Sequence, residues 1–133
     1  MSSFPQPDPL RLETVARATT VVIKVGTNVL ADAAGTLDRY RIQSLADQLS
    51  RVRAGGRKVV LVTSGAIGAG VGKLGLARRP TDLPQLQACA AVGQSALMQL
   101  YQESLAPHGV HTAQILLTAG DFDSRARYLN VRN

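Results

Sequence analysis

The stretch VVIKVGTN at residues 21–28 decides how the rest of this chain is expected to fold. Its β-branched run over residues 21–25 is short and apolar on both faces, which is typical of a buried parallel strand. The run ends at residues 26–28, where a glycine permits a turn. A second run, VVLV at residues 59–62, ends in the same manner at Thr63-Ser64-Gly65. We therefore expect two buried strands, each followed by a turn that carries polar residues.

The segments around these strands are expected to form helices and short connections. One helix should run from an N-cap at Asp38 to the stop signal at Gly55-Gly56, because its apolar residues recur at helical spacing. Further helices are expected from about Gly65 onward and over residues 83–106. A small hairpin or loop is expected over residues 29–37, and an irregular connection over residues 74–84.

The order of these elements predicts an α/β fold. A third buried strand is expected at residues 115–117, followed by a helix that begins at Asp121 or Ser124. Alternation of this kind predicts a three-layer αβα architecture with a mainly parallel sheet and helices on both faces. Three prolines within residues 1–9 predict a flexible N-terminal tail over residues 1–19, to which residues 10–18 can add a short helical turn. The ordered domain is expected over residues 20–133.

The composition excludes several classes of protein. The chain has 133 residues, of which 45% are apolar, too many for a wholly disordered protein. Fifteen basic against nine acidic residues give a net charge of +6, but the basic residues are scattered, so no nucleic-acid partner is expected. No apolar run approaches the roughly 20 residues that span a bilayer, and no secretion signal is recognised. With one cysteine, we expect a cytoplasmic protein without a Cys-rich metal site. Because no run could span a bilayer, no membrane partner is expected.

The first candidate site lies at the end of the first strand. Ligands of parallel α/β sheets gather at the carboxyl ends of strands. A lysine inside an apolar buried strand, as expected for Lys24, is costly unless it is paired or used. Lys24, next to the permissive Gly26 and the hydroxyl of Thr27, is therefore a candidate phosphate-binding residue. The alternative is a lysine paired with a carboxylate from elsewhere in the chain.

The second candidate site lies at the end of the second strand. Ser64 and Gly65 precede an expected helix, whose free backbone N–H groups would face an anion such as a carboxylate or a phosphate. The alternative is that Ser64 only caps this helix. The two interpretations are compatible, since a capping site can also bind a ligand.

Other motifs are expected to be structural. GVGKLG at residues 70–75 matches the dinucleotide-binding pattern but begins well past the end of its strand, so these glycines are expected to pack helices together. The small residues AAVGQS at 90–95 should allow another backbone to approach closely. Cys89 is expected to be a buried thiol, and His108 and His111 surface or packing residues.

Five motifs in order resemble one known family. VIKVGTNVL at residues 22–30 resembles the opening strand of the amino-acid kinase fold. VTSGAI at 62–67 followed by Ala69-Gly70, AAVGQ at 90–94, QILLT at 114–118 and RYLN at 127–130 resemble the glutamate 5-kinase branch of that family. The resemblance covers about residues 20–133. It departs at Asn28, where serine is common and hydrogen-bonding capacity is retained.

This resemblance implies an activity and a set of site residues. The activity is transfer of the ATP γ-phosphate to the side-chain carboxylate of L-glutamate, which gives glutamyl 5-phosphate, the first intermediate of proline biosynthesis. Mg²⁺ would accompany the ATP, and the full-length enzyme would be a homo-oligomer. The residues that carry over are Lys24 as the catalytic lysine, Lys24, Gly26 and Thr27 at ATP, and Ser64, Gly65 and Ala66 at glutamate. No residue carries over as a metal ligand.

The resemblance also bears on the extent of the protein. The family's catalytic domain continues well past residue 133, so residues 20–133 are expected to be the N-terminal, glutamate-side part of a truncated kinase domain. Such a part is expected to be inactive alone, because the nucleotide-binding motifs lie downstream. The alternative is a non-catalytic α/β module that binds a small anion or a partner chain.

Overall fold

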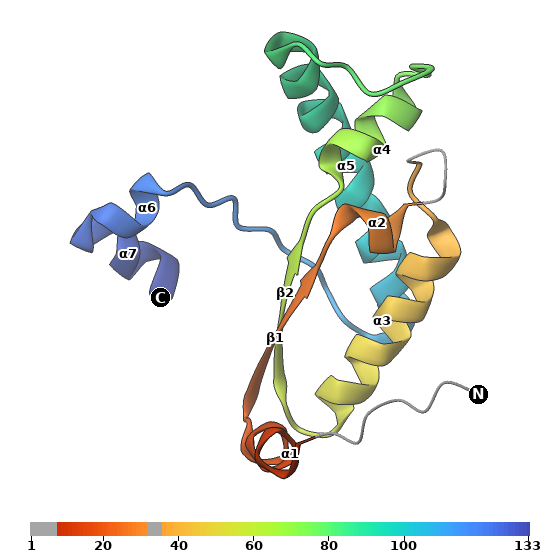
Figure 1. Cartoon of the computed structure of the whole chain (residues 1–133). Coiled ribbons are helices and arrows are strands. Elements are labelled where there is room, and N and C mark those ends of the chain that lie inside the picture. Colours follow the sequence, from red (N-terminus) through yellow and green to blue (C-terminus); the bar gives the residue numbers. More distant parts are fainter. Residues whose placement is uncertain (1–7, 32–35) are drawn as a thin grey trace.

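A computed structural model describes residues 8–31 and 36–133 of the chain. The elements, in chain order, are α1 (Pro9–Arg17), β1 (Thr20–Val25), α2 (Thr27–Leu30), α3 (Arg39–Ala54), β2 (Lys58–Thr63), α4 (Ala66–Lys73), α5 (Leu83–Leu105), the 3₁₀ turn η1 (Ala106–His108), α6 (Gly120–Asp123) and α7 (Arg125–Arg132). Figure 1 shows α3 and α5 on one side of the two strands.

The N-terminal part of the chain contains the short helical segment that the sequence predicts. The helical turn expected over residues 10–18 is confirmed as α1, which Asp8 caps by accepting a hydrogen bond from the Leu10 N–H at 2.9 Å. The rest of the expected tail includes residues 1–7, which lie outside the described residues. The hairpin or loop expected over 29–37 is closed by an antiparallel bridge between Ala31 and Leu37, and residues 32–35 again lie outside the described residues.

The sheet of the described residues consists of β1 and β2, which pair in parallel as expected. The register places Thr20 opposite Lys58 and Val25 opposite Thr63. The two strands therefore end side by side, and the turns that follow them meet at one edge of the sheet.

One face of this sheet carries the core. Val25 packs with Leu30, Ile42, Leu97 and Tyr101 in a single buried cluster, to which β1, α2, α3 and α5 all contribute. The N-cap expected at Asp38 is confirmed, since its carboxylate accepts a hydrogen bond from the Arg41 N–H at 3.2 Å. The apolar stripes of α3 and α5 thus cover the sheet face that the odd-numbered residues of β1 form.

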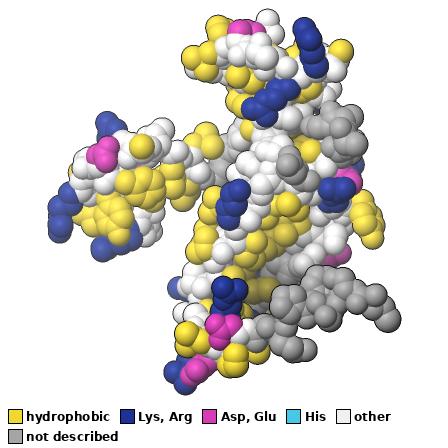
Figure 2. Space-filling model, viewed as in Figure 1, with side chains coloured by type: hydrophobic (Ala, Val, Ile, Leu, Met, Phe, Trp, Pro, Cys, Tyr) yellow, Lys and Arg dark blue, Asp and Glu magenta, His cyan; other side chains and the backbone are white. Residues whose placement is uncertain are grey.

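The opposite face of the sheet is exposed, so the expectation of strands buried on both faces is wrong for the described residues. Val22, Val60 and Val62 remain 64%, 48% and 49% exposed. Figure 2 shows hydrophobic side chains gathered along this face. An apolar run shows that both faces of a strand could be buried, but burial also requires a layer that covers each face. The described helices cover one face only.

The expectation of a third strand at residues 115–117 is also wrong for the described residues. These residues pair with no strand within residues 8–31 and 36–133, and Ile115 and Leu116 are each 71% exposed. The segment leads from η1 past the sheet to α6 and α7, which stand apart from the other helices (Figure 1). A strand exists only when a neighbouring backbone pairs with it, and an apolar run alone does not supply that neighbour. The helix expected at Asp121 or Ser124 is split in two, with Ser124 as the N-cap residue of α7.

Two glycines bring α4 and α5 into backbone contact. A Cβ atom on Gly70 would lie 1.9 Å from the carbonyl oxygen of Cys89, and one on Gly93 would lie 1.8 Å from the carbonyl oxygen of Ala66. Both expectations about small residues are therefore confirmed: Gly70 of the GVGKLG motif packs helices, and the 90–95 run admits a second backbone. This contact fixes the start of α4, where the second strand end meets its helix.

No helix within residues 8–31 and 36–133 has both the length and the apolar character that a membrane crossing requires.

Candidate functional site

The two strand ends singled out in the sequence meet through their hydroxyl groups. Thr27 Oγ1 lies 3.1 Å from Ser64 Oγ, and Ser64 Oγ donates to the carbonyl oxygen of Val25 at 3.3 Å. A hydroxyl has one hydrogen, so Ser64 must accept from Thr27 while it donates to Val25. The parallel pairing of β1 with β2 thus brings Thr27 and Ser64, 37 residues apart, into one hydrogen-bonded group.

Lys24 lies beside this group but is not buried. Its side chain is exposed on the uncovered face of the sheet, which corrects the expectation of a lysine inside a buried strand. Its Nζ lies 3.5 Å from the position that a Cβ on Gly26 would occupy, so the ammonium group reaches over the turn at the end of β1. No salt bridge joins Lys24 to a carboxylate among the described residues, and the carboxylate-paired alternative is therefore not observed there.

The backbone at the second strand end requires a glycine. Gly65 has φ = +119° and occupies the N-cap position of α4, a conformation that side-chain-bearing residues rarely adopt. Ser64 therefore does not cap this helix, and its hydroxyl bonds Val25 instead. Within the part of the chain that the structure describes, the N–H groups of Gly65, Ala66 and Ile67 have no acceptor. Free N–H groups at a helix start are suited to an anion.

Sequence reasoning missed a tyrosine hydroxyl behind the strand end. Tyr101 is 3% exposed, and its hydroxyl lies 2.8 Å from Thr63 Oγ1. Burial raises the pKa of the Tyr101 phenol, so the group stays protonated at neutral pH. The sequence places Tyr101 in the apolar stripe of the 83–106 helix. The signal that could have found it is general: a buried tyrosine hydroxyl needs a hydrogen-bond partner.

The remaining motif residues take structural positions. Cys89 is fully buried, as expected for a structural thiol. His108 Nε2 lies 2.9 Å from Asp47 Oδ1, which joins η1 to α3 and lowers the pKa of the Asp47 carboxyl. His111 is exposed. Within residues 8–31 and 36–133, no three His, Cys, Asp or Glu side chains gather where they could hold a metal ion.

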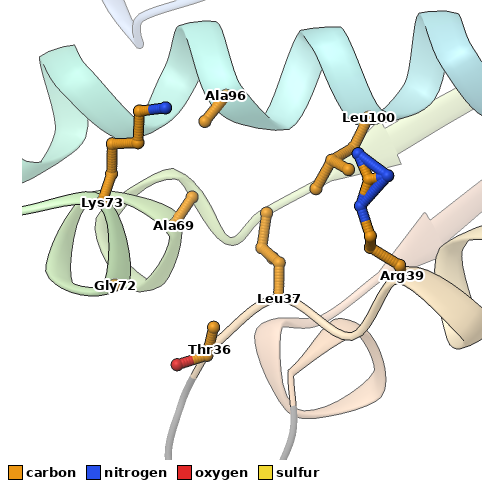
Figure 3. Close-up of a pocket in the computed structure, with 8 residues that line it drawn as sticks. All are labelled: Thr36, Leu37, Arg39, Ala69, Gly72, Lys73, Ala96 and Leu100. Carbon is orange, nitrogen blue, oxygen red and sulfur yellow. The ribbon is translucent and has the colours of Figure 1, made fainter.

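A separate hollow of about 280 Å³ lies between the start of α3, α4 and α5 (Figure 3). Arg39 and Lys73 stand at its rim, and apolar side chains including Leu37 and Leu100 line it. Arg39 already pairs with Glu103 at 2.6 Å. The hollow includes none of the site residues expected from the sequence. The hydrogen-bonded pair of Thr27 and Ser64 at the strand ends therefore remains the candidate site.

These features define an α/β protein with a polar sheet edge suited to an anion, where a lysine, two hydroxyls and free backbone N–H groups lie close together. The chain belongs to the amino acid kinase family, whose sequence profile matches residues 19–133. The family resemblance of its motifs is thereby confirmed.

Two curated relatives agree with this assignment. The chain is 50% identical over 124 residues to glutamate 5-kinase from Rhodopirellula baltica, an alignment that covers 93% of this chain and 32% of the relative. Glutamate 5-kinase from Myxococcus xanthus is 51% identical over 116 residues, with 87% of this chain and 30% of the relative covered. The chain thus spans about a third of the length of the curated relatives it matches. Among solved structures, carbamate kinase from Giardia lamblia bound to citric acid matches with a TM-score of 0.47 and 22% identity, over 69% of this chain and 32% of that one.

Proposed function

We propose that the protein carrying this chain at full length is a glutamate 5-kinase, which transfers the γ-phosphoryl group of ATP to the side-chain carboxylate of L-glutamate. The observation that carries the proposal is the convergence of Lys24, Thr27 and Ser64 at one sheet edge, beside the unpaired N–H groups that open α4. The names and identities of the relatives support it. The product, glutamyl 5-phosphate, would be the first intermediate of proline biosynthesis.

The proposed roles follow from the chemistry of phosphoryl transfer. A carboxylate oxygen of glutamate attacks the γ-phosphorus, a new O–P bond forms, and the bond to ADP breaks. This reaction depends on positioning and on neutralising spread negative charge, not on a protein nucleophile. Lys24 would contact the transferring phosphoryl group, and its ammonium has no carboxylate partner among the described residues to compete for it.

The two strand ends would divide the ligands between them. Gly26 and Thr27 would lie at the phosphates of ATP, because they follow β1 next to the Lys24 ammonium. Ser64, Gly65 and Ala66 would hold glutamate through the free N–H groups and through the Ser64 O–H, which would turn from the Val25 carbonyl to the bound carboxylate. Mg²⁺ would accompany ATP, but the described residues offer no cluster of metal ligands, so no residue of this chain is assigned to it and no step is derived through it.

The proposal extends to the architecture of the full protein. A three-layer αβα fold would place a second helical layer over the exposed face that carries Val22, Val60 and Val62, since parallel sheets are normally covered on both faces. A cytoplasmic homo-oligomer is proposed with it.

The test is a product trap on the purified full-length protein. Acyl phosphates react with hydroxylamine to give a coloured hydroxamate, so glutamate, ATP, Mg²⁺ and hydroxylamine should yield glutamyl hydroxamate at the rate of ADP release. Blanks without glutamate and without ATP set the background. Binding of glutamate without any hydroxamate would favour the alternative, a non-catalytic anion-binding module, and would overturn the kinase proposal.

Removal of the Ser64 hydroxyl should weaken glutamate binding selectively. We expect Ser64→Ala in the full-length protein to raise the KM for glutamate about three- to tenfold and to leave the KM for ATP nearly unchanged, because the variant loses the O–H that would turn from the Val25 carbonyl to the glutamate carboxylate. Steady-state kinetics with each substrate varied in turn measures both constants. Ser95→Ala, on the exposed side of α5, is the matched control. A larger change in the KM for ATP would place Ser64 on the wrong ligand.

A further inference from the structure

A directed chain of hydrogen bonds runs from the core to the backbone of the candidate site. Thr63 Oγ1 donates to the carbonyl oxygen of Ser64 at 3.2 Å. Because the Thr63 hydroxyl has a single hydrogen, its 2.8 Å contact with the Tyr101 hydroxyl must be one in which tyrosine donates. The order is therefore Tyr101 O–H to Thr63, and Thr63 O–H to the Ser64 carbonyl. Tyr101 projects from α5, so the chain ties a long core helix to the strand end.

This chain sets the direction of a neighbouring N–H group. The peptide that joins Ser64 to Gly65 is planar and trans, so its carbonyl and its N–H point in opposite directions. With the carbonyl held toward Thr63, the Gly65 N–H is turned away from the core. That N–H is one of the groups without an acceptor among the described residues.

The packing of the core does not require the Tyr101 hydroxyl. The ring fills the buried cluster with Leu97 and Ile42, and phenylalanine would fill the same volume. Burying a phenol costs free energy unless its hydroxyl is bonded, and among the described residues Thr63 is its bonding partner. The hydroxyl thus acts on the rest of the molecule through Thr63.

We infer that Tyr101 is a positioning residue for the acceptor substrate: through Thr63 it orients the Ser64–Gly65 peptide so that the Gly65 N–H faces the bound carboxylate. This inference deepens the proposed function and rests on it for the identity of the carboxylate.

The kinetic test removes the two hydroxyls of the hydrogen-bonded chain, one at a time. In the full-length protein, Tyr101→Phe and Thr63→Val should each raise the KM for glutamate about three- to tenfold, while the KM for ATP stays within about 1.5-fold. The double variant should be no worse than the poorer single variant, because both changes break the same link. Tyr40→Phe, which alters an exposed tyrosine on α3, is the control and should leave both constants unchanged.

A second readout does not depend on activity. Ser64–Gly65 is the only Ser-Gly pair in the 133 residues, so serine labelled with ¹³C at the carbonyl and glycine labelled with ¹⁵N give one cross-peak for this peptide. In cell-free labelled chain, that peak should shift in Tyr101→Phe and Thr63→Val and stay in place in Tyr40→Phe.

The outcomes separate the inference from the proposed function. An active wild type with an unchanged glutamate KM in Tyr101→Phe overturns the inference, as do equal losses for both substrates that follow a lower Tm. An inactive wild type overturns the kinase proposal, and the labelled peak then decides the inference. A peak that shifts in both Tyr101→Phe and Thr63→Val supports the positioning role, and an unmoved peak overturns it.

Discussion

Lys24→Met in the full-length protein is expected to lower kcat about 10²–10³-fold, the loss that follows removal of one charged contact to a transition state. Methionine keeps the length of the side chain and removes its charge. Lys24 lies on the exposed face of the sheet, next to apolar neighbours such as Val22 and Val62, so methionine adds no buried strain. The expected result is a folded protein that binds its substrates and turns over slowly.

The matched control for this variant is Lys58→Met. Lys58 lies on the same exposed face, but opposite Thr20 at the start of the strands, far along the sheet from the candidate site. Single-turnover rates at saturating glutamate and ATP, with Tm measured alongside, isolate the chemical step. A Lys24→Met rate within about threefold of wild type, equivalent to less than about 0.7 kcal/mol, would contradict the phosphoryl role.

The parts of the fold that could be predicted from the sequence are those with local causes. The strand expected at 21–25 and the helix that starts after Asp38 follow from β-branched runs, caps and apolar spacing within a few residues. The strand expected at 115–117 failed because a strand also needs a neighbour, which no local pattern specifies. The same reason explains Lys24: its strand was identified correctly, but its exposure depends on which layers cover the sheet.

The candidate site divides along the same line. Thr27 and Ser64 could each be selected because ligands gather at the carboxyl ends of parallel strands, and the structure places them 3.1 Å apart. The link from Tyr101 to Thr63 could not be predicted, because it joins residues 38 positions apart through the packing of α5 on the sheet. Their roles toward ATP and glutamate remain predictions that the variants above test.

Gly93→Ala is expected to lower the free energy of unfolding of the chain by about 2–4 kcal/mol, near the upper end of what one added methyl group causes in a packed interior. The added Cβ would lie 1.8 Å from the Ala66 carbonyl oxygen and 2.3 Å from the Gly70 nitrogen. Both are backbone atoms of α4, so no side-chain rotation relieves the overlap and the whole helix must move. The gain of about 1 kcal/mol that alanine brings to a helix interior offsets only part of this cost.

Urea unfolding followed by circular dichroism measures this loss, and Gly72→Ala on α4 is the matched control. A Cβ at Gly72 would lie 3.3 Å from the Thr36 methyl group, a side-chain atom of an exposed residue that can give way, so its unfolding free energy should change by less than about 1 kcal/mol. Equal stability of the two variants would show that α4 and α5 do not meet at Gly93. Because the overlap falls on Ala66, the first residue of α4, its relief would also displace the N–H groups of Gly65 and Ala66. Gly93→Ala molecules that still fold, in the full-length protein at low temperature, should therefore need more glutamate, and the Gly72→Ala variant should not.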